Sequence, residues 1–203
     1  MIKLKQRYHF SLSMLNRLFT LIYSWVNKFR FHYWGKHSTI EYSAKLIAPY
    51  LIDVGSNVNI SEYAWLNAKD DRGDQNPTLK IGNGTSIGRF VQINCWQDVI
   101  IEDNVLIADR VFISDADHKF HDLSVPIKNQ GDYFKGAVRL KVGCWIGIGA
   151  VILPGVTVGK NAIIGANSVI RNDVPDFAVV SGNPAKIIKY LDNKVINSLP
   201  ENL

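Results

Sequence analysis

One histidine stands where it could act as a general base. His118 is flanked by Asp115, Asp117 and Asp122 in the segment SDADHKFHDL, directly after an apolar run that predicts a strand. A neutral imidazole accepts a proton from a hydroxyl group, and its unperturbed pKa of about 6.5 allows this near neutral pH. A neighbouring carboxylate would fix the ring tautomer. Taken alone, these residues leave two interpretations open, a general base or a surface histidine in an acidic loop.

A second histidine and two cysteines raise the question of a metal. His121 follows His118 by three residues, but the other three histidines all lie before residue 40, ahead of the repeats described below. A third metal ligand is therefore missing. Cys95 and Cys144 lie far apart, with no CxxC spacing and no clustering with histidine. We therefore expect no metal and no disulfide.

The elements that must position His118 follow a period of six residues. From Leu140 the chain reads LKVGCW, IGIGAV, ILPGVT, VGKNAI, IGANSV and IRNDV. Helices repeat apolar residues every three or four positions and strands every two, whereas a period of six indicates a solenoid of short strands and corners. Glycine and asparagine suit the corners, because they tolerate positive φ. Two inward columns are predicted: Leu140, Ile146, Ile152, Val158, Ile164 and Ile170, and the smaller Cys144, Ala150, Val156, Ala162, Ser168 and Val174.

The period begins weakly near Ile40 and is interrupted in three places. Residues 67–78, NAKDDRGDQNPT, read as a loop whose acids we expect to be solvated, with contact to a polar substrate as the alternative. A slip of two residues in CWQD predicts a bulge at a corner. A polar and aromatic excursion over residues 117–139 carries His118, and such excursions from a rigid scaffold commonly carry function.

These repeats resemble the hexapeptide-repeat acyltransferases. The run WIGIGAVILPGVTVGKNAIIGANSVIRNDVP, followed by VVSGNPAKIIK, is similar to that family's signature, and the DxDH run is similar to its sugar O-acetyltransferase branch. The resemblance implies an all-β solenoid, a left-handed parallel β-helix that assembles as a homotrimer with active sites between subunits. The left hand rests on the resemblance alone, since parallel crossovers are usually right-handed.

The resemblance also favours a catalytic His118, with Asp115 and Asp117 as catalytic candidates beside it. It implies direct transfer from acetyl-CoA to a hydroxyl group, without an acyl-enzyme. Asn94 resembles an asparagine that contacts the acceptor in related enzymes, and a structural corner residue is its alternative. His121 and Tyr133 are further candidates for binding the acceptor, Tyr133 by stacking on a sugar ring, with loop packing as the alternative.

For the coenzyme, the resemblance implies a slot near the last coils. Arg171 stands where some relatives have a small hydroxyl residue. Asn183 and Pro184 predict the N-cap and first residue of a final helix, whose start would favour an anion. The residues expected to bind acetyl-CoA are Trp145, Ile148, Ala166, Arg171, Asn183, Lys186 and Lys189.

The N-terminal segment is basic and amphipathic. Residues 1–40 contain seven Lys or Arg and no acid, a charge of +7, so the remaining 16 basic and 18 acidic residues sum to −2. Helical spacing predicts a helix over 12–33, with Ser11 or Ser13 as N-cap, whose apolar stripe is Leu15, Leu18, Phe19, Ile22, Val26 and Phe29. We expect it to cover the open end of the first coil or pack on a neighbouring subunit; the alternative is peripheral contact with an anionic membrane.

Three segments are therefore expected: a basic helical segment (1–38), the β-helix (39–182), and a C-terminal helix and tail (183–203). We find no cleavable signal and no apolar run of the roughly 20 residues that span a bilayer, and expect a cytoplasmic protein, with a place at the inner face of the membrane as the alternative. The predicted function is O-acetylation of a sugar in surface polysaccharide or lipopolysaccharide synthesis. N-acetylation of an amino sugar nucleotide is the first alternative and a non-catalytic trimeric scaffold the second; nucleic-acid binding is not expected.

Overall fold

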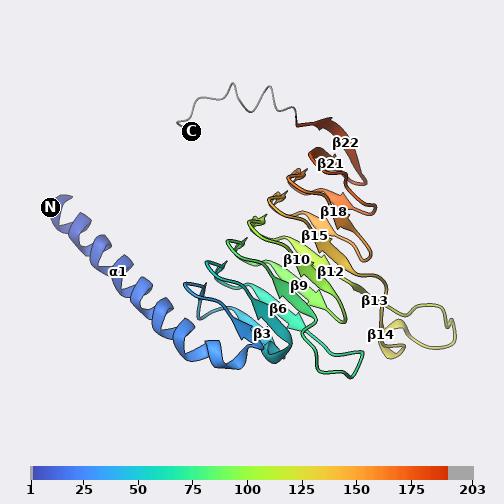
Figure 1. Ribbon diagram of the computed structural model, residues 1–203, viewed down its shortest axis with the longest axis horizontal. Coiled ribbons are helices and arrows are strands. Elements are labelled where there is room, and N and C mark those ends of the chain that lie inside the picture. Colours follow the sequence, from blue (N-terminus) through green and yellow to red (C-terminus); the bar gives the residue numbers. More distant parts are fainter. Residues whose placement is uncertain (1, 192–203) are drawn as a thin grey trace.

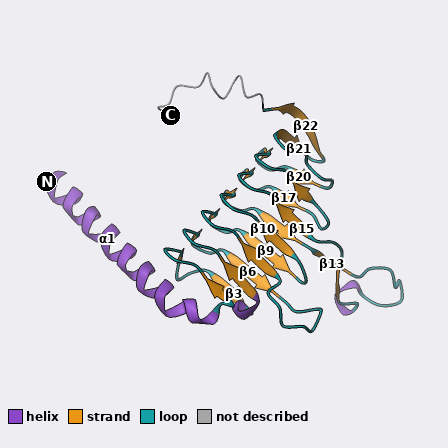
Figure 2. Cartoon of the chain, in the orientation of Figure 1, coloured by secondary structure: helices purple, strands orange, loops and turns teal. Residues whose placement is uncertain are grey.

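The computed structural model of the 203-residue chain describes residues 2–191, and the side chains from Met14 onward. Within that range the chain winds into a three-sided prism, to which each coil contributes one strand per side (Figure 1). The three sheets are parallel, except that the last strand, β22, pairs antiparallel with β21. Figure 2 shows that regular helix is concentrated at the N-terminal end. The predicted solenoid is confirmed.

The bounds of the strands follow the coils in order. The first sheet contains β1 (Tyr33–Trp34), β4 (Ile52–Val54), β7 (Leu79–Ile81), β10 (Val99–Ile101), β15 (Val138–Leu140) and β18 (Thr157–Val158). The second contains β2 (Thr39–Ile40), β5 (Asn59–Ile60), β8 (Ser86–Ile87), β11 (Leu106–Ile107), β16 (Trp145–Ile146), β19 (Ile163–Ile164), β21 (Ala178–Gly182) and β22 (Ala185–Tyr190). The third contains β3 (Lys45–Ile47), β6 (Trp65–Ala68), β9 (Gln92–Cys95), β12 (Phe112–Ser114), β17 (Val151–Ile152) and β20 (Val169–Ile170).

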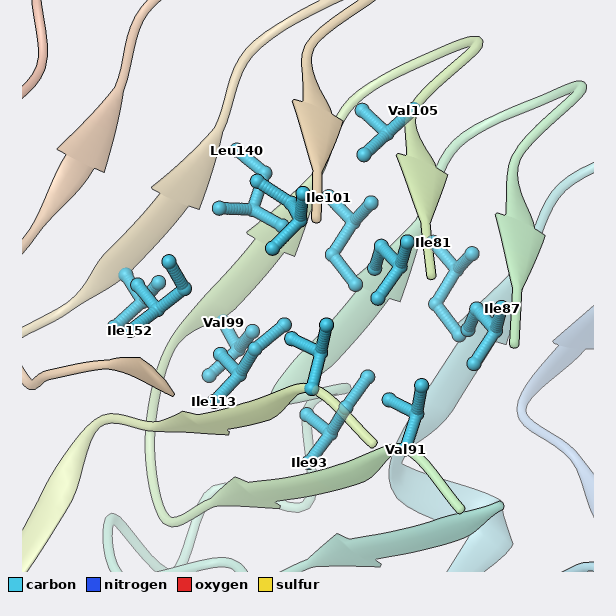
Figure 3. Close-up of a cluster of buried hydrophobic side chains, with 14 of the residues drawn as sticks. Ile81, Ile87, Val91, Ile93, Val99, Ile101, Val105, Ile113, Leu140 and Ile152 are labelled. Carbon is cyan, nitrogen blue, oxygen red and sulfur yellow. The ribbon is translucent and has the colours of Figure 1, made fainter. Parts of the chain in front are cut away.

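The core is the stack of inward aliphatic side chains. Ile81, Ile101 and Leu140 are in register on consecutive coils, and all are buried (Figure 3). The six predicted large positions from Leu140 to Ile170 are at most 1% exposed, and the small column from Cys144 to Val174 is buried as well. Both predicted columns are therefore confirmed. Each coil adds apolar area to one continuous core, as a solenoid requires.

Close stacking of the coils explains particular glycines. A Cβ at Gly159 would lie 2.4 Å from the backbone nitrogen of Asp176 on the next coil, so a larger residue would push the coils apart. Gly155 has φ +82°, a conformation that side chains with a Cβ rarely adopt. The corner glycines thus serve two needs, positive φ at some positions and close approach at others.

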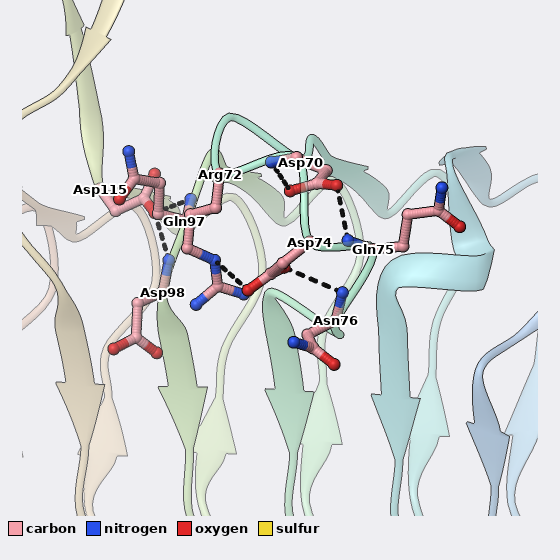
Figure 4. Close-up of polar contacts among 9 residues, drawn as sticks. Asp70, Arg72, Asp74, Gln75, Asn76, Gln97, Asp98 and Asp115 are labelled. Atoms are coloured by element: carbon pink, nitrogen blue, oxygen red, sulfur yellow. Dashed lines mark hydrogen bonds and ion pairs between the residues drawn. The ribbon is translucent and has the colours of Figure 1, made fainter.

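The excursions leave the prism along one edge, between the third and the first sheet. They are the 3₁₀ turn η2 (Pro49–Leu51), the loop before β7, the turn after β9, and the hairpin of β13 (Ala116–His118) and β14 (Asp132–Phe134). In the loop before β7, Asp70 accepts backbone N–H groups of Gly73 and Gln75, at 2.7 and 2.8 Å (Figure 4). The acidic side chains of this loop mostly bond to groups of the loop itself, as expected for a loop that does not contact a substrate.

The N-terminal helix differs from its prediction in both length and orientation. Helix α1 spans Ile2–Asn27 and is followed by the 3₁₀ turn η1 (Lys28–Arg30), so Ser11 and Ser13 lie inside the helix and are not N-caps. The helix contacts β2 through Ser24 and the following Glu41 through Thr20, whereas the predicted apolar stripe is exposed. Helix and coil do pack, but through the polar side. Among the described residues, no helix is long and apolar enough to cross a membrane.

The predicted C-terminal helix is wrong for the described residues. Residues 185–190 form β22, which pairs with β21 in an antiparallel hairpin, with Asn183 and Pro184 in its turn. Pairing with the open edge of β21 satisfies more backbone groups than a short terminal helix would. The helix N-terminus expected to favour an anion is therefore absent from residues 183–191, and residues 192–203 lie outside the described part. The solenoid also begins at β1, before the predicted boundary at residue 39.

Candidate active site

The site is built on the β13–β14 hairpin, which leaves the prism after β12. Its register pairs His118 directly with Asp132, and Asp117 with Tyr133. Residues opposite each other on antiparallel strands bring their side chains together. His118 Nδ1 lies 2.5 Å from Asp132 Oδ1, with the histidine side chain 73% and the aspartate side chain 31% exposed. Asp132 was not among the predicted residues, because cross-strand register is invisible in the local sequence.

Asp115 does not contact His118, so its predicted role beside the base is corrected. Its side chain is fully buried and accepts N–H groups of Trp96, Gln97 and Asp98, each at 2.8 Å (Figure 4 draws Asp115 with the last two). Its backbone carbonyl accepts from Lys135 at 2.9 Å. Asp115 therefore ties the turn after β9 to the base of the hairpin, which explains the slip in CWQD.

Asp117 pairs with a lysine rather than with the histidine ring. Lys135 Nζ lies 2.6 Å from Asp117 Oδ2. This hydrogen bond holds the pKa of the Asp117 carboxyl below its ordinary value, and the same contact raises the pKa of the Lys135 ammonium. The pair thus stays charged on both sides at neutral pH, and Asp132 is the carboxylate in contact with the His118 ring.

A cavity of about 440 Å³ opens between the hairpin and the outer face of the third sheet. The predicted residues that line it are His118, Asp117, Asn94 and Arg171. Trp96 also lines it; from the sequence this residue could either stack on a sugar ring or pack within a loop. Sequence reasoning gave no such role to the others, which are Phe112, Ser114, Ala116, Asp132, Lys135, Leu153 and Pro154.

Asn94 is oriented by two neighbouring amides. Its Oδ1 accepts from Asn67 Nδ2 and from Gln92 Nε2, both at 3.3 Å. An amide carries one acceptor oxygen and a donor nitrogen, so the Asn94 NH₂ group remains to donate to a ligand. The Trp96 indole nitrogen in the same wall is buried with no hydrogen-bond partner among the described residues. Through Asn94, the cavity therefore offers a hydrogen-bond donor as well as a base.

The remaining predicted residues lie away from this cavity in the isolated chain. His121 packs its ring against Phe120, with centroids 4.5 Å apart, and does not line the cavity; neither does Tyr133. Trp145 and Ile148 are exposed on the second sheet and its corner, where Ile148 lines a shallow hollow with Leu106. The others are exposed on the last coils and the C-terminal hairpin: Ala166, Asn183, Lys186 and Lys189.

The two cysteines do not provide a nucleophile. Cys95 and Cys144 are free and buried. Burial raises the pKa of the Cys144 thiol to about 12 and also raises that of Cys95. Thiolate is the reactive form, so neither side chain is reactive at neutral pH. Among the described side chains, residues 14–191, no group of three or more His, Cys, Asp or Glu could hold a metal ion.

The fold and the site define a class of protein. The prism of hexapeptide coils is a left-handed parallel β-helix, and residues 143–172 match the profile of the family described as "Bacterial transferase hexapeptide (six repeats)". The solved structure of AntD, an N-acyltransferase from Bacillus cereus in complex with dTDP and 3-hydroxybutyryl-CoA, superposes with a TM-score of 0.71 at 24% identity, over 85% of this chain and 89% of that one. That likeness supports the fold.

Two relatives match this chain over much more than the repeats at residues 143–172. The galactoside O-acetyltransferase of Escherichia coli K12 is 35% identical over 163 residues, 77% of this chain and 72% of that protein. The "Probable acetyltransferase Rv3034c" of Mycobacterium tuberculosis is 34% identical over 138 residues, 68% of this chain but only 44% of that protein's length. The chain belongs to the hexapeptide-repeat acetyltransferase family.

Proposed function

We propose that the protein is an acetyl-CoA-dependent O-acetyltransferase that acylates a hydroxyl group of a sugar, in surface polysaccharide or lipopolysaccharide synthesis. The observation that carries this proposal is the 2.5 Å contact between His118 and Asp132 at the mouth of a cavity on the β-helix. The galactoside acceptor in the name of the Escherichia coli relative supports a sugar hydroxyl.

The His118–Asp132 pair defines the proton path. An ionised carboxylate only accepts hydrogen bonds, so the proton of the neutral ring sits on Nδ1 and Nε2 is free. His118 Nε2 takes the proton of the acceptor hydroxyl as its oxygen attacks the thioester carbonyl carbon. The carbon–sulfur bond of the tetrahedral intermediate then breaks, and the imidazolium returns the proton to the departing thiolate of CoA.

Two other side chains of the cavity are assigned supporting roles. The Asn94 amide, oriented by Asn67 and Gln92, donates to the acceptor or to the oxyanion, a contact that stabilises charge developing in the transition state. Arg171 lines the same cavity and has no ion-pair partner among the described residues, while Lys135 is neutralised by Asp117. Arg171 is therefore the cation we assign to an anionic part of the coenzyme.

We further propose that the protein works as a homotrimer in the cytoplasm, with acetyl-CoA held between copies. Three large apolar side chains, Leu106, Trp145 and Ile148, are 45–49% exposed on the second sheet and its corner. Leu106 and Trp145 are paired on adjacent coils. Another subunit placed there would cover this patch and form the slot in which Trp145 and Ile148 are predicted to bind the coenzyme.

A second candidate is N-acylation, because the AntD structure is that of an N-acyltransferase with a dTDP ligand. Both reactions would use the same base. An assay of purified protein with acetyl-CoA and paired acceptors, a neutral sugar and its amino counterpart, separates them by which one becomes acetylated. A non-catalytic scaffold predicts neither product and no calorimetric binding of CoA.

A further inference from the structure

An apolar face of α1 remains uncovered. The outer face, as we name it, consists of Leu15, Leu18, Ile22, Trp25, Val26 and the adjoining Phe29, whose exposed fractions run from 53 to 75%. At 100° per residue these positions lie on one side of the helix. Figure 1 shows α1 meeting the first coil at its C-terminal end and running away from the solenoid toward its N-terminus. A contiguous apolar face of this kind marks an interaction surface.

The opposite side of α1 is fixed to the β-helix by polar contacts. Thr20 Oγ1 donates to the Glu41 carboxylate at 2.9 Å. The Ser24 hydroxyl accepts from the backbone nitrogen of Ile40 at 2.9 Å and lies 3.3 Å from its carbonyl oxygen. These contacts satisfy backbone groups at the open edge of the second sheet. The helix therefore cannot rotate to bury its outer face on its own coil without leaving those groups unpaired.

The charges around the outer face indicate what covers it. Residues 1–40 carry seven Lys or Arg and no Asp or Glu. Lys28 Nζ lies 4.9 Å from the centre of the Phe29 ring and 5.8 Å from that of Trp25. A lysine beside aromatic rings at the edge of an apolar helix face can bury its stem while its ammonium group stays in a polar layer.

We propose that α1 lies in the plane of an anionic lipid bilayer, with the outer face in the acyl boundary and its basic residues against the headgroups. Burial of an apolar face and attraction of Lys and Arg to anionic lipid are the two terms that drive such binding. Pairing of α1 with α1 of a second copy fits less well, because it would bring two acid-free segments of charge +7 together. This inference rests on α1 alone and is independent of the acetyl transfer proposed above.

The test is sedimentation of the full chain with vesicles of phosphatidylcholine, with and without phosphatidylglycerol. Wild type should pellet with the anionic vesicles and dissociate as salt is raised. Ile22→Asp should lower the partition coefficient at least about tenfold, because it removes a large apolar side chain from the boundary. The matched control is Leu123→Asp, the same change at a side chain that is 98% exposed in the hairpin loop and distant from α1 in sequence. It should bind like wild type.

Tryptophan emission gives a second measurement that does not depend on a charged variant. Wild type should shift to shorter wavelength with anionic vesicles, and Trp25→Phe, which keeps an aromatic residue, should lose most of that shift. The proposal is overturned if wild type stays in the supernatant, or if Ile22→Asp and Leu123→Asp bind equally. It is also overturned if Ile22→Asp instead dissociates an oligomer that never binds vesicles, which would assign the outer face to a second copy.

Discussion

Replacing Asp132 by Asn tests the assignment of the base most sharply. Asn keeps the size of the side chain, but it removes the charge and can offer an N–H to Nδ1, which favours the tautomer with Nε2 protonated. A hydrogen bond to a charged group contributes about 1.5–3 kcal/mol. Because His118 is 73% and Asp132 31% exposed, solvent screens the pair, and the lower end of that range applies.

A loss of about 1.5–2 kcal/mol in transition-state stabilisation corresponds to a decrease of about 10- to 30-fold in kcat. The assay is release of CoA thiol from acetyl-CoA with a sugar acceptor, at saturating coenzyme. The KM for acetyl-CoA should change little, since Asp132 acts through the histidine. Buried triads lose far more on the same substitution, so an effect of several thousandfold would mean that the site closes around the pair.

Asp122→Asn is the matched control. Asp122 lies in the same hairpin loop, where its carboxylate accepts from Ser124 N and Oγ, at 2.9 and 2.6 Å, rather than from the His118 ring. It should keep wild-type kcat. Equal activity of Asp132→Asn and wild type, or an equal loss in both variants, would refute the assignment of Asp132 as the residue that orients the base.

Three further predictions concern the base, the corner and the thiols. His118→Ala should unfold at the wild-type temperature and bind CoA as wild type does in calorimetry, because the side chain is 73% exposed and makes no core contact; a lower unfolding temperature would give His118 a structural role. Asp115→Ala should lower the free energy of unfolding by about 3–5 kcal/mol in denaturant titration, because three backbone N–H groups lose their acceptor in a buried corner, and a change below 1 kcal/mol would contradict that bookkeeping. Cys144 should resist iodoacetamide at pH 8 in the folded protein and react after denaturation, since its pKa of about 12 keeps the thiol protonated four units below that value; rapid labelling of native protein would show an accessible thiolate.

The repeat pattern was enough to predict the prism, because each unit of six residues places its own side chains inward or outward. Ile146 and Cys144 were placed correctly without reference to distant parts of the chain. The same locality accounts for the predicted excursion that carries His118. What period six does not encode is how excursions pair with one another.

Asp132 was missed for that reason. It stands beyond a polar loop, and only the hairpin register brings it opposite His118. The sequence did contain a signal for this hairpin, because the segments Ala116–His118 and Asp132–Phe134 bracket a loop that ends in a glycine. That glycine, Gly131, stands directly before the second strand and has a φ of +78°. Asp115 was misassigned because proximity in sequence to a histidine does not reveal a side chain turned into a buried corner.

The two terminal errors have tertiary causes. An apolar helical stripe usually faces a core, but the end of this β-helix offers backbone groups of β2, which hydroxyls such as Ser24 satisfy and aliphatic side chains cannot. At the other end, the Asn183–Pro184 pair fits a helix cap locally, yet the open edge of β21 recruits the following residues as a strand. Neither sheet edge could be seen before the coils were assembled.

The most direct test of the account is to incubate wild type and His118→Ala with acetyl-CoA and a panel of neutral and amino sugars, and to identify acetylated products by mass spectrometry. We expect wild type to add one acetyl group to a sugar oxygen, with equimolar release of CoA, and His118→Ala, though folded and CoA-binding, to form no product above background. Undiminished product from His118→Ala would contradict it.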